Sequence, residues 1–370
     1  MDQSDYIETP NRYYVLMMRA IELAGSVQGA TAPNPWVGAV ISDGNSILGE
    51  GSTQPAGGEH AEIVALRQAG ERARGSSLIV TLEPCCHHGR TGPCTDAIIA
   101  AGIKRVAVGI TDPDLRVSGQ GIAALRKAGI EVTEGICIDA VSDQLAPYIK
   151  VRTTGRPWVV LKLAMTSDGK IAAGDGSSQW ITGEEARNDA HRLRAISDAV
   201  IVGAGTIRVD DPRLTFRLDS FGLDWPQPLR VVLGRIEGAA KVRPALELSG
   251  DLVNILDELG NKGVIQVLVE GGAKVANRFH RAGLVDRYVF YVAPALFGGD
   301  EALGMFSGPG GSNMSQLWRG QFKTVQQLGD DIRIEIEPIV DSSNMDFENS
   351  SGKGVVAKPK ISNSDGGPRD

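Results

Sequence analysis

Apolar residues recur along the first part of the chain with two different periods. From Arg12 to Gly25 they follow helical spacing, which predicts an amphipathic helix. The apolar runs 37–42 and 46–49 are separated by Asp43-Gly44-Asn45, which predicts a hairpin. Alternating elements follow, with strands expected at 78–82, 105–110 and 130–134 and helices at 60–69, 94–101 and 121–128. This order is typical of a three-layer α/β sandwich.

A second α/β pattern begins at Trp158, after a stretch from Asp139 to Gly155 that reads as a helix and then a linker. Its strands are expected at 158–164, 199–202, 229–233, 264–269 and 287–292, and its helices at 184–194, 252–259 and 273–282. From Asp341 the chain becomes polar and rich in Ser, Asn, Gly and Pro, which predicts disorder. We therefore expect domains at 1–150 and 151–340 and a disordered tail at 341–370.

Composition narrows the range of functions. The apolar fraction of 42% and the charged fraction of 22% are those of a globular protein, and no run of 18 apolar residues predicts a membrane span. A net charge of −7 argues against a nucleic-acid binder, since such proteins depend on clustered Lys and Arg. The first ten residues lack the basic and then apolar order of a secretory signal, so a cytoplasmic location is expected.

Cysteines and histidines provide the chemical signal. The chain has only four cysteines, too few for a disulfide framework at this length, and three of them lie between 85 and 94. Glu59-His60-Ala61-Glu62 opens a predicted helix, Cys85 follows a predicted strand, and Cys94 opens another helix. One imidazole and two thiolates leave a fourth tetrahedral position for water, which is the arrangement of a catalytic zinc site.

The position of His60 at a helix start makes this pattern more specific. Side chains two residues apart diverge within a helix, so His60 and Glu62 can serve one site only in the first turn. Glu62 would then be no ligand but the group that moves protons, as in zinc deaminases. Cys94 would sit at the positive end of a helix, which favours its thiolate. A lone His before a helix is usually a capping or surface residue, and only the three segments together favour the metal site.

Two further segments extend the pattern. Upstream of the zinc motif lies Ala32-Pro33-Asn34-Pro35-Trp36-Val37-Gly38. The two predicted ligands Cys85 and Cys94 are separated by eight residues, Cys86-His87-His88-Gly89-Arg90-Thr91-Gly92-Pro93. With the zinc motif, they resemble the deaminase half of the bifunctional deaminase–reductase family of riboflavin biosynthesis. The resemblance implies a cytidine-deaminase-like domain with zinc ligands His60, Cys85 and Cys94, Glu62 as proton shuttle, and substrate contacts from Asn34, His87 and Arg90. The implied substrate is a phosphoribosylaminopyrimidine.

The sequence departs from the family pattern at some positions in this half. Thr53 stands where the family usually has a His, seven residues before the zinc His, and Glu59 replaces a small residue or Pro. Gly92 replaces a common Pro. None of the three is a predicted metal ligand, but Thr53 changes how the substrate would be held.

The second half resembles the reductase domain of the same family, whose fold is similar to that of dihydrofolate reductase. The motifs that carry this resemblance are 161–169, 177–183, 198–203, 210–215, 268–272 and 293–299. It implies reduction of the ribosyl group to ribityl with NADPH, although the choice between NADPH and NADH is left open. A Gly271-Gly272 turn before a helix can hold a cofactor pyrophosphate, but it is not the G-x-G-x-x-G fingerprint of a Rossmann domain.

Site residues of the reductase follow from the resemblance, motif by motif. The cofactor contacts are Ala164, Trp180, Thr206, Asp210 and the turn made by Gly272, Ala273, Lys274, Val275, Ala276, Asn277 and Arg278. The substrate contacts are Ser178, Arg194, Leu214, Arg217 and Glu270. Lys162 and Glu270 are the candidates for moving protons at the reacting carbon.

The reductase half also departs from the family, between its third and fourth expected strands. Only residues 234–263 separate these strands, where the family usually has some tens more, and Gly234 replaces a polar residue. The loss of a central strand would expose a sheet edge and remove part of the cofactor wall, unless pairing or dimerisation compensates.

Three alternatives stay open at this stage. The chain could be a deaminase whose reductase half is only a scaffold or a dimerisation module. It could be a deaminase of free nucleosides or nucleic acid, or it could be a structural zinc module without activity. The leading interpretation is a bifunctional enzyme that acts on a small molecule, binds neither nucleic acid nor membrane, and self-associates.

Overall fold

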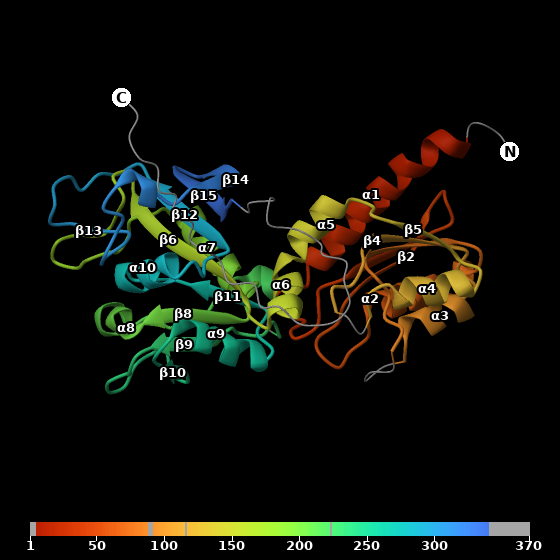
Figure 1. Ribbon diagram of the computed structural model, residues 1–370, viewed down its shortest axis with the longest axis horizontal. Helices are drawn as coiled ribbons and strands as arrows, with labels where there is room; N and C mark the ends of the chain where they lie inside the picture. Colours follow the sequence, from red (N-terminus) through yellow and green to blue (C-terminus); the bar gives the residue numbers. More distant parts are fainter. Residues whose placement is uncertain (1–4, 88–91, 115–116, 223, 340–370) are drawn as a thin grey trace, which may run out of the picture. The chain divides into compact units, whose positions relative to one another are not determined.

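The protein contains two main β-sheets, one in each predicted half of the chain (Figure 1). The computed structural model describes residues 5–87, 92–114, 117–222 and 224–339. The predicted disordered tail, 341–370, therefore lies outside the described residues. No helix within these ranges is both long enough and apolar enough to cross a bilayer.

The first sheet has five strands in the order β2-β1-β3-β4-β5. Their bounds are β1 (Gly38–Ser42), β2 (Ile47–Ser52), β3 (Ser77–Leu82), β4 (Arg105–Ile110) and β5 (Glu131–Glu134). β1 is antiparallel to both β2 and β3, whereas β3, β4 and β5 are parallel. The predicted hairpin is confirmed as β1 and β2.

Helices cover both faces of this sheet, which confirms the predicted three-layer sandwich (Figure 1). The helices α1 (Asp5–Gly25) and α5 (Ile138–Gln144) lie on one face, and α2 (Ala61–Ala69), α3 (Cys94–Ala100) and α4 (Gln120–Lys127) lie on the other. Gly51 of β2 allows α2 to approach closely, because a Cβ there would lie 2.2 Å from the Ala61 carbonyl oxygen. This contact fixes the start of α2, where His60 and Glu62 lie.

The second sheet has eight strands in the order β10-β9-β8-β11-β6-β12-β15-β14. Six consecutive strands are parallel, and β15 and β14 add an antiparallel hairpin. The bounds are β6 (Trp158–Thr166), β8 (Ala199–Gly203), β9 (Leu229–Leu233), β10 (Leu246–Leu248), β11 (Gln266–Val269), β12 (Arg287–Ala293), β14 (Gly320–Leu328) and β15 (Asp331–Pro338). The short strands β7 (Lys170–Ala172) and β13 (Leu303–Gly304) form a separate pair.

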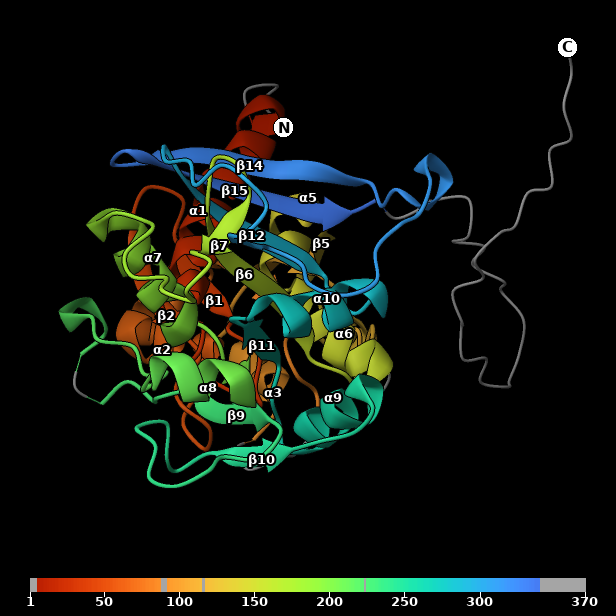
Figure 2. The ribbon, with the colours of Figure 1, turned by 90° about the vertical axis from the view of Figure 1, so that its left-hand side faces the viewer.

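Two separate cores enclose the second sheet. The helices α9 (Leu252–Asn261) and α10 (Ala273–Arg281) pack on the face that carries Leu161 and Leu163. The helices α7 (Glu184–Ala195) and α8 (Ala204–Asp210) pack on the face that carries Val160 and Val200. Figure 2 shows the two helix pairs on opposite sides of the sheet. Because both faces are covered, the inner strands have the continuous apolar sequences typical of parallel sheets.

One expectation about local structure is wrong. The stretch 139–155 forms two helices, α5 and α6 (Ala146–Thr154), where a helix and a linker were expected. The shortened segment 234–263 does not remove a central strand, because β8 pairs directly with β11 on one side and with β9 on the other. This segment instead supplies β10, a three-residue strand at the edge, where pairing on one side is sufficient.

Candidate active sites

The three predicted zinc ligands come together at the ends of three elements. His60 is the residue before α2, Cys85 follows β3, and Cys94 is the first residue of α3. His60 Nδ1 lies 3.2 Å from Cys94 Sγ and 3.5 Å from Cys85 Sγ. All three potential ligand atoms lie within 4.8 Å of one another.

This donor set fits zinc. Tetrahedral zinc with bond lengths of roughly 2.0–2.3 Å separates its nitrogen and sulfur ligands by about 3.5 Å. The observed separations of 3.2 and 3.5 Å need only a small adjustment. Among the described residues, this is the one group of three or more His, Cys, Asp or Glu side chains that could hold a metal. Three protein ligands leave one position open, as expected for a catalytic site.

The two thiols differ in acidity because they share one contact. The pKa of Cys85 is lowered to about 4, chiefly because the Cys94 thiol donates to its sulfur, helped by His60 and the Cys94 backbone N–H. The same contact raises the pKa of Cys94 above its ordinary value. That the helix start favours the Cys94 thiolate in the zinc site stays a prediction.

Glu62 faces the metal ligands from the first turn of α2. Its side chain is buried, with 4% of its surface exposed, and burial raises its pKa to about 7, with Cys85 acting in the same direction. A hydrogen bond with Cys94 places the carboxyl group at the site. A carboxyl group that exchanges protons near neutral pH is suited to general acid–base work.

Two buried residues outside the predicted ligand set hold the surrounding backbone. Glu83 is buried and accepts hydrogen bonds from the backbone N–H groups of Asp112, Gly119 and Ile122. It thereby ties the segment that leads to Cys85 to the start of α4. Thr53, the departure from the family His, is also buried, and its hydroxyl accepts a hydrogen bond from the Val37 N–H at 3.0 Å.

The predicted substrate contacts of this half are only partly described. Asn34 lies in a tight turn in which the Asn34 N–H donates to the Thr31 carbonyl oxygen and the Thr31 hydroxyl donates to the Asn34 carbonyl oxygen. The His87 side chain is exposed. Arg90 lies outside the described residues, so its predicted role stays a prediction.

In the second half, charged side chains gather around Glu270, which directly follows β11. Arg194 of α7 donates to both carboxylate oxygens, and Nη2 lies 2.7 Å from Oε2. Burial alone would raise the pKa of Glu270, but Arg194 and then Lys162 lower it below its ordinary value. Burial lowers the pKa of Lys162, and Glu270 opposes that shift. Glu270 therefore stays ionised, and Lys162 is the better proton donor of the two.

The cofactor turn between β11 and α10 is shaped by glycine. Gly271 has a φ of 77°, which side-chain-bearing residues rarely adopt, and a Cβ there would lie 3.2 Å from Leu163 Cδ2. The Gly272 N–H donates to the Thr206 hydroxyl at 3.2 Å, so two predicted cofactor residues are in contact. The turn precedes the N-terminus of α10, and the first backbone N–H groups of a helix, which lack partners within it, can bind an anion.

Not every residue from Gly272 to Arg278 can offer its side chain to a cofactor. Val275 and Ala276 are buried in the core. Asn277 donates to the Pro309 carbonyl oxygen, and Arg278 donates to the Gly250 carbonyl oxygen. This part of the prediction is compatible with backbone contacts at the start of α10, whereas these four side chains stabilise the fold.

Other predicted reductase residues lie on the loops that follow parallel strands. Ser178 hydrogen-bonds to Asp210, which links a predicted substrate residue to a predicted cofactor residue. Trp180 is exposed, and the Arg187 guanidinium lies 4.8 Å from its ring centroid. Leu214 has a φ of 54°, a strained backbone conformation for a leucine, and such strain is concentrated at functional sites.

Ala164 and Arg217 complete the predicted set. Ala164 lies two residues after Lys162 on β6, so both side chains point to the same face of the sheet. Arg217 is exposed and acts electrostatically on His191 of α7, close to Arg194.

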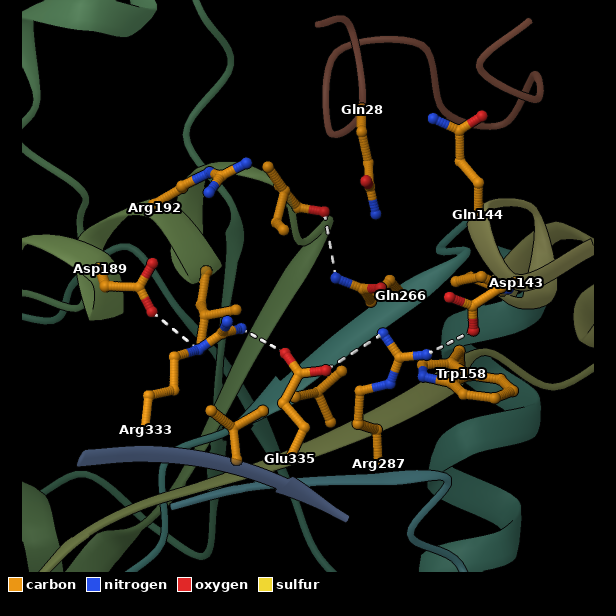
Figure 3. A pocket seen from close by; sticks show the side chains of 15 residues that line it. Gln28, Asp143, Gln144, Trp158, Asp189, Arg192, Gln266, Arg287, Arg333 and Glu335 are labelled. Atoms are coloured by element: carbon orange, nitrogen blue, oxygen red, sulfur yellow. Dashed lines mark hydrogen bonds and ion pairs between the residues drawn. The ribbon is translucent and has the colours of Figure 1, made fainter. Parts of the chain in front are cut away.

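Figure 3 shows a polar cavity of about 240 Å³, whose lining does not include Glu270 or Arg194. Trp158, Gln266 and Arg287, which line it, are the first residues of β6, β11 and β12. The cofactor turn follows the opposite end of β11. Since ligands of parallel α/β sheets bind beyond the carboxyl ends of the strands, this cavity is not the reductase site.

Comparisons with known families match both halves. Residues 11–110 match the cytidine and deoxycytidylate deaminase zinc-binding region, and residues 157–334 match the RibD C-terminal domain. The riboflavin biosynthesis protein RibD of Mycobacterium tuberculosis is 43% identical, over 86% of this chain and 95% of its own length. RibD of Escherichia coli is 36% identical, over 88% of this chain and 99% of its own length.

Solved structures agree with these sequence matches. Acinetobacter baumannii RibD aligns with a TM-score of 0.84 and 38% identity, covering 89% of this chain and 99% of that one. A diaminohydroxyphosphoribosylaminopyrimidine deaminase/5-amino-6-(5-phosphoribosylamino)uracil reductase of Thermotoga maritima aligns with a TM-score of 0.81 and 37% identity, over 89% and 99% of the two chains. The expected folds, the zinc and NADPH chemistry and the two enzyme activities are thereby confirmed, and the chain belongs to the RibD family of bifunctional deaminase–reductases of riboflavin biosynthesis.

Proposed function

We propose that this chain deaminates 2,5-diamino-6-(5-phosphoribosylamino)pyrimidin-4-one by hydrolysis and then reduces the ribosyl group of the product to ribityl with NADPH. The observation that carries the first reaction is the meeting of His60, Cys85 and Cys94 beside the buried carboxyl group of Glu62. Support for the second comes from the Lys162, Arg194 and Glu270 cluster near the cofactor turn. The alternative of a decayed reductase lacks support, since the strand of the shortened segment, β10, lies at the sheet edge and its helix α9 packs in the core.

In the deaminase half, His60, Cys85 and Cys94 would hold zinc, which supplies an activated water near neutral pH. Glu62 takes a proton from that water and delivers it to a ring nitrogen as the new C–O bond forms. It then takes the proton of the newly formed hydroxyl group and delivers it to the amino group, which leaves as ammonia while the C–N bond breaks and the carbonyl forms. The amide of Asn34 offers a donor and an acceptor to the pyrimidine edge.

In the reductase half, NADPH bound at the Gly271-Gly272 turn would supply the hydride. The hydride adds to C1′ of the ribose, the bond from C1′ to the ring oxygen breaks, and that oxygen takes up one proton. Lys162 is the proton donor, since burial makes its ammonium group more acidic. Glu270 remains a carboxylate and positions Lys162 and Arg194.

The proposed organisation places the deaminase in 1–150, the reductase in 151–340 and a tail in 341–370. We include a cytoplasmic location and self-association in this proposal. The edge strand β14 supports self-association, because its side chains Phe322 and Val325 are exposed and open strand edges favour pairing. Light scattering of the purified protein tests it, and a monomer at micromolar concentration would contradict it.

The decisive experiment measures the two reactions separately on the zinc-loaded full-length protein. Ammonia release is followed with the diaminopyrimidinone substrate alone, and loss of NADPH absorbance is followed with the deaminated intermediate. We expect both signals. Ammonia release without NADPH oxidation would leave only a deaminase, and release from cytidine or adenosine at a similar rate would point to a nucleoside deaminase instead.

A further inference from the structure

His191 of α7 lies beside the charged side chains of the reductase half, but neither the motifs nor the proposed reactions give it a role. It lies three residues before Arg194, which places both on the same face of the helix. Its Nδ1 lies 3.5 Å from Arg194 Nη1, and its side chain is half-buried. His191 therefore belongs to the charged cluster of the reductase half.

Arg194 is fixed from three directions in this cluster. Its Nε and Nη2 donate to Glu270, and its Nη1 donates to the Thr215 carbonyl oxygen at 3.2 Å. The Thr215 segment comes from the loop after α8, which also carries Leu214 and Arg217. The guanidinium thus connects α7, the end of β11 and this loop beside the imidazole of His191.

The cluster has more positive than negative charge. Lys162, Arg194 and Arg217 are cations that act on His191, and the Glu270 carboxylate acts on it in the opposite direction. Burial, then Arg194 and Arg217, lower the pKa of His191 to about 4, so its imidazole is neutral at neutral pH. With Nδ1 facing the Arg194 donor, the ring proton belongs on Nε2, which makes Nε2 a hydrogen-bond donor.

A surplus of cations, of which Arg217 is exposed, and a neutral donor together suit a multiply charged anion with several acceptor oxygens. The proposed substrate carries one such group, its 5-phosphate. We propose that His191 is a further ligand of the substrate phosphate in the reductase site, donating from Nε2 while Arg194 and Arg217 supply the charge. This inference rests on the proposed function, because it concerns the phosphate of that substrate.

The inference separates two roles that a histidine in this position could have. A phosphate ligand affects only substrates that carry the phosphate. A residue that merely supports Arg194 affects phosphorylated and dephosphorylated substrates alike, since Arg194 and Glu270 would shift together. The ratio of kcat/KM for the deaminated intermediate to kcat/KM for its dephosphorylated form is therefore the informative quantity.

The test uses the zinc-loaded full-length protein and its variants His191→Ala and His191→Gln, with NADPH oxidation as the readout. One charge-assisted hydrogen bond is worth about tenfold or more in affinity. We expect His191→Ala to lower the phosphate preference about tenfold, mainly through KM. His191→Gln keeps an amide donor and should retain most of the preference, and it also serves if the alanine variant does not fold.

The matched control is Arg192→Ala, on the same helix. Arg192 faces the separate polar cavity (Figure 3) and should leave the preference unchanged. An unchanged preference in His191→Ala, or an equal loss with both substrates, would overturn the inference. Ammonia release by each variant reports on the intact deaminase half. Absence of NADPH oxidation in the unmodified protein would instead contradict the proposed function itself.

Discussion

Arg194 holds Glu270 by both of its carboxylate oxygens, with Nη2 donating to Oε2 at 2.7 Å and Nε donating to Oε1. The side chains are 17% and 8% exposed, so little water reaches the pair. Lys162 lies close enough to influence the pKa of Glu270. A buried pair of this kind leaves an uncompensated charge behind when one partner is removed.

Glu270→Gln should therefore abolish reduction and destabilise the reductase half. We expect at least a hundredfold loss of NADPH oxidation, because Lys162 and Arg194 lose their carboxylate, and a loss of about 3 kcal/mol in the free energy of unfolding. Ammonia release should not change. The control is Asp257→Asn, which breaks an exposed pair with Arg156 and should cost under about 1 kcal/mol.

Glu62→Gln should retain zinc and lose deamination. The amide resembles the neutral carboxyl group that burial favours, so the fold should tolerate it, but it cannot move protons. A loss of about 10²–10⁴-fold in ammonia release is expected. Glu59→Gln, which removes a partner of Arg67, should remain active. Full activity of the Glu62 variant would exclude the shuttle role.

Cys94→Ser should lose zinc, because two ligands cannot hold the ion as three do. Elemental analysis of the purified variant measures this directly, and ammonia release should fall with the metal content. The control is Cys137→Ser, because Cys137 precedes α5 and is not among the grouped ligands. Full zinc occupancy in the Cys94 variant would contradict the ligand assignment.

Gly271→Ala should weaken cofactor binding. The added Cβ meets Leu163 and the positive φ is strained for alanine, at a cost of about 1 kcal/mol or more. We expect a higher KM for NADPH, with deamination unaffected. Gly283→Ala is the control, since Gly283 also has a positive φ but lies after α10 with no atom within 4 Å of the added Cβ. Equal effects on KM would argue against the cofactor turn.

Asp198 should make stability depend on pH. It joins β8 to β11 by accepting hydrogen bonds from the Ile265 and Gln266 N–H groups, and burial raises its pKa to about 6 from 3.8. The folded protein thus binds a proton on the Asp198 carboxyl group more tightly than the unfolded chain does. The protonated group therefore contributes its full stabilisation of the fold below pH 4, and this contribution is lost as the pH rises through 6. In Asp198→Asn, the fall in the free energy of unfolding between pH 4 and pH 6 should be smaller by about 1–2 kcal/mol. The free energy of unfolding is measured by urea titration at several pH values. The same dependence on pH in the variant and the unmodified protein would contradict the prediction.

Local patterns in the sequence were sufficient for most of the fold. The apolar runs that became β3, β4, β8 and β9 are buried on both faces, and the glycines after the helices mark their ends. The hairpin of β14 and β15 was missed because the side chains of β14 are exposed on both faces, which removes the alternation that identifies a strand. The edge position of β10, the strand of the shortened segment, was missed because the order of strands along the chain does not give their order in a sheet.

The metal site was predictable because its ligands carry their own chemistry. His60, Cys85 and Cys94 are residue types that bind zinc, and each adjoins an element end. Glu83 and His191 were not predictable in this way. The role of Glu83 depends on backbone groups more than twenty-five residues away, and that of His191 depends on Arg217, which lies in a different loop.

The two sheets differ in when their strands are synthesised. All strands of the first lie between residues 38 and 134, and its metal ligands lie between 60 and 94. In the second, β6 is bordered by β11 and β12, which begin only at Gln266 and Arg287. On the ribosome, the metal-binding half can therefore fold while both edges of β6 are still unpaired, because β11 and β12 have not yet been synthesised. A chain interrupted between these points would carry a folded first half joined to an aggregation-prone strand.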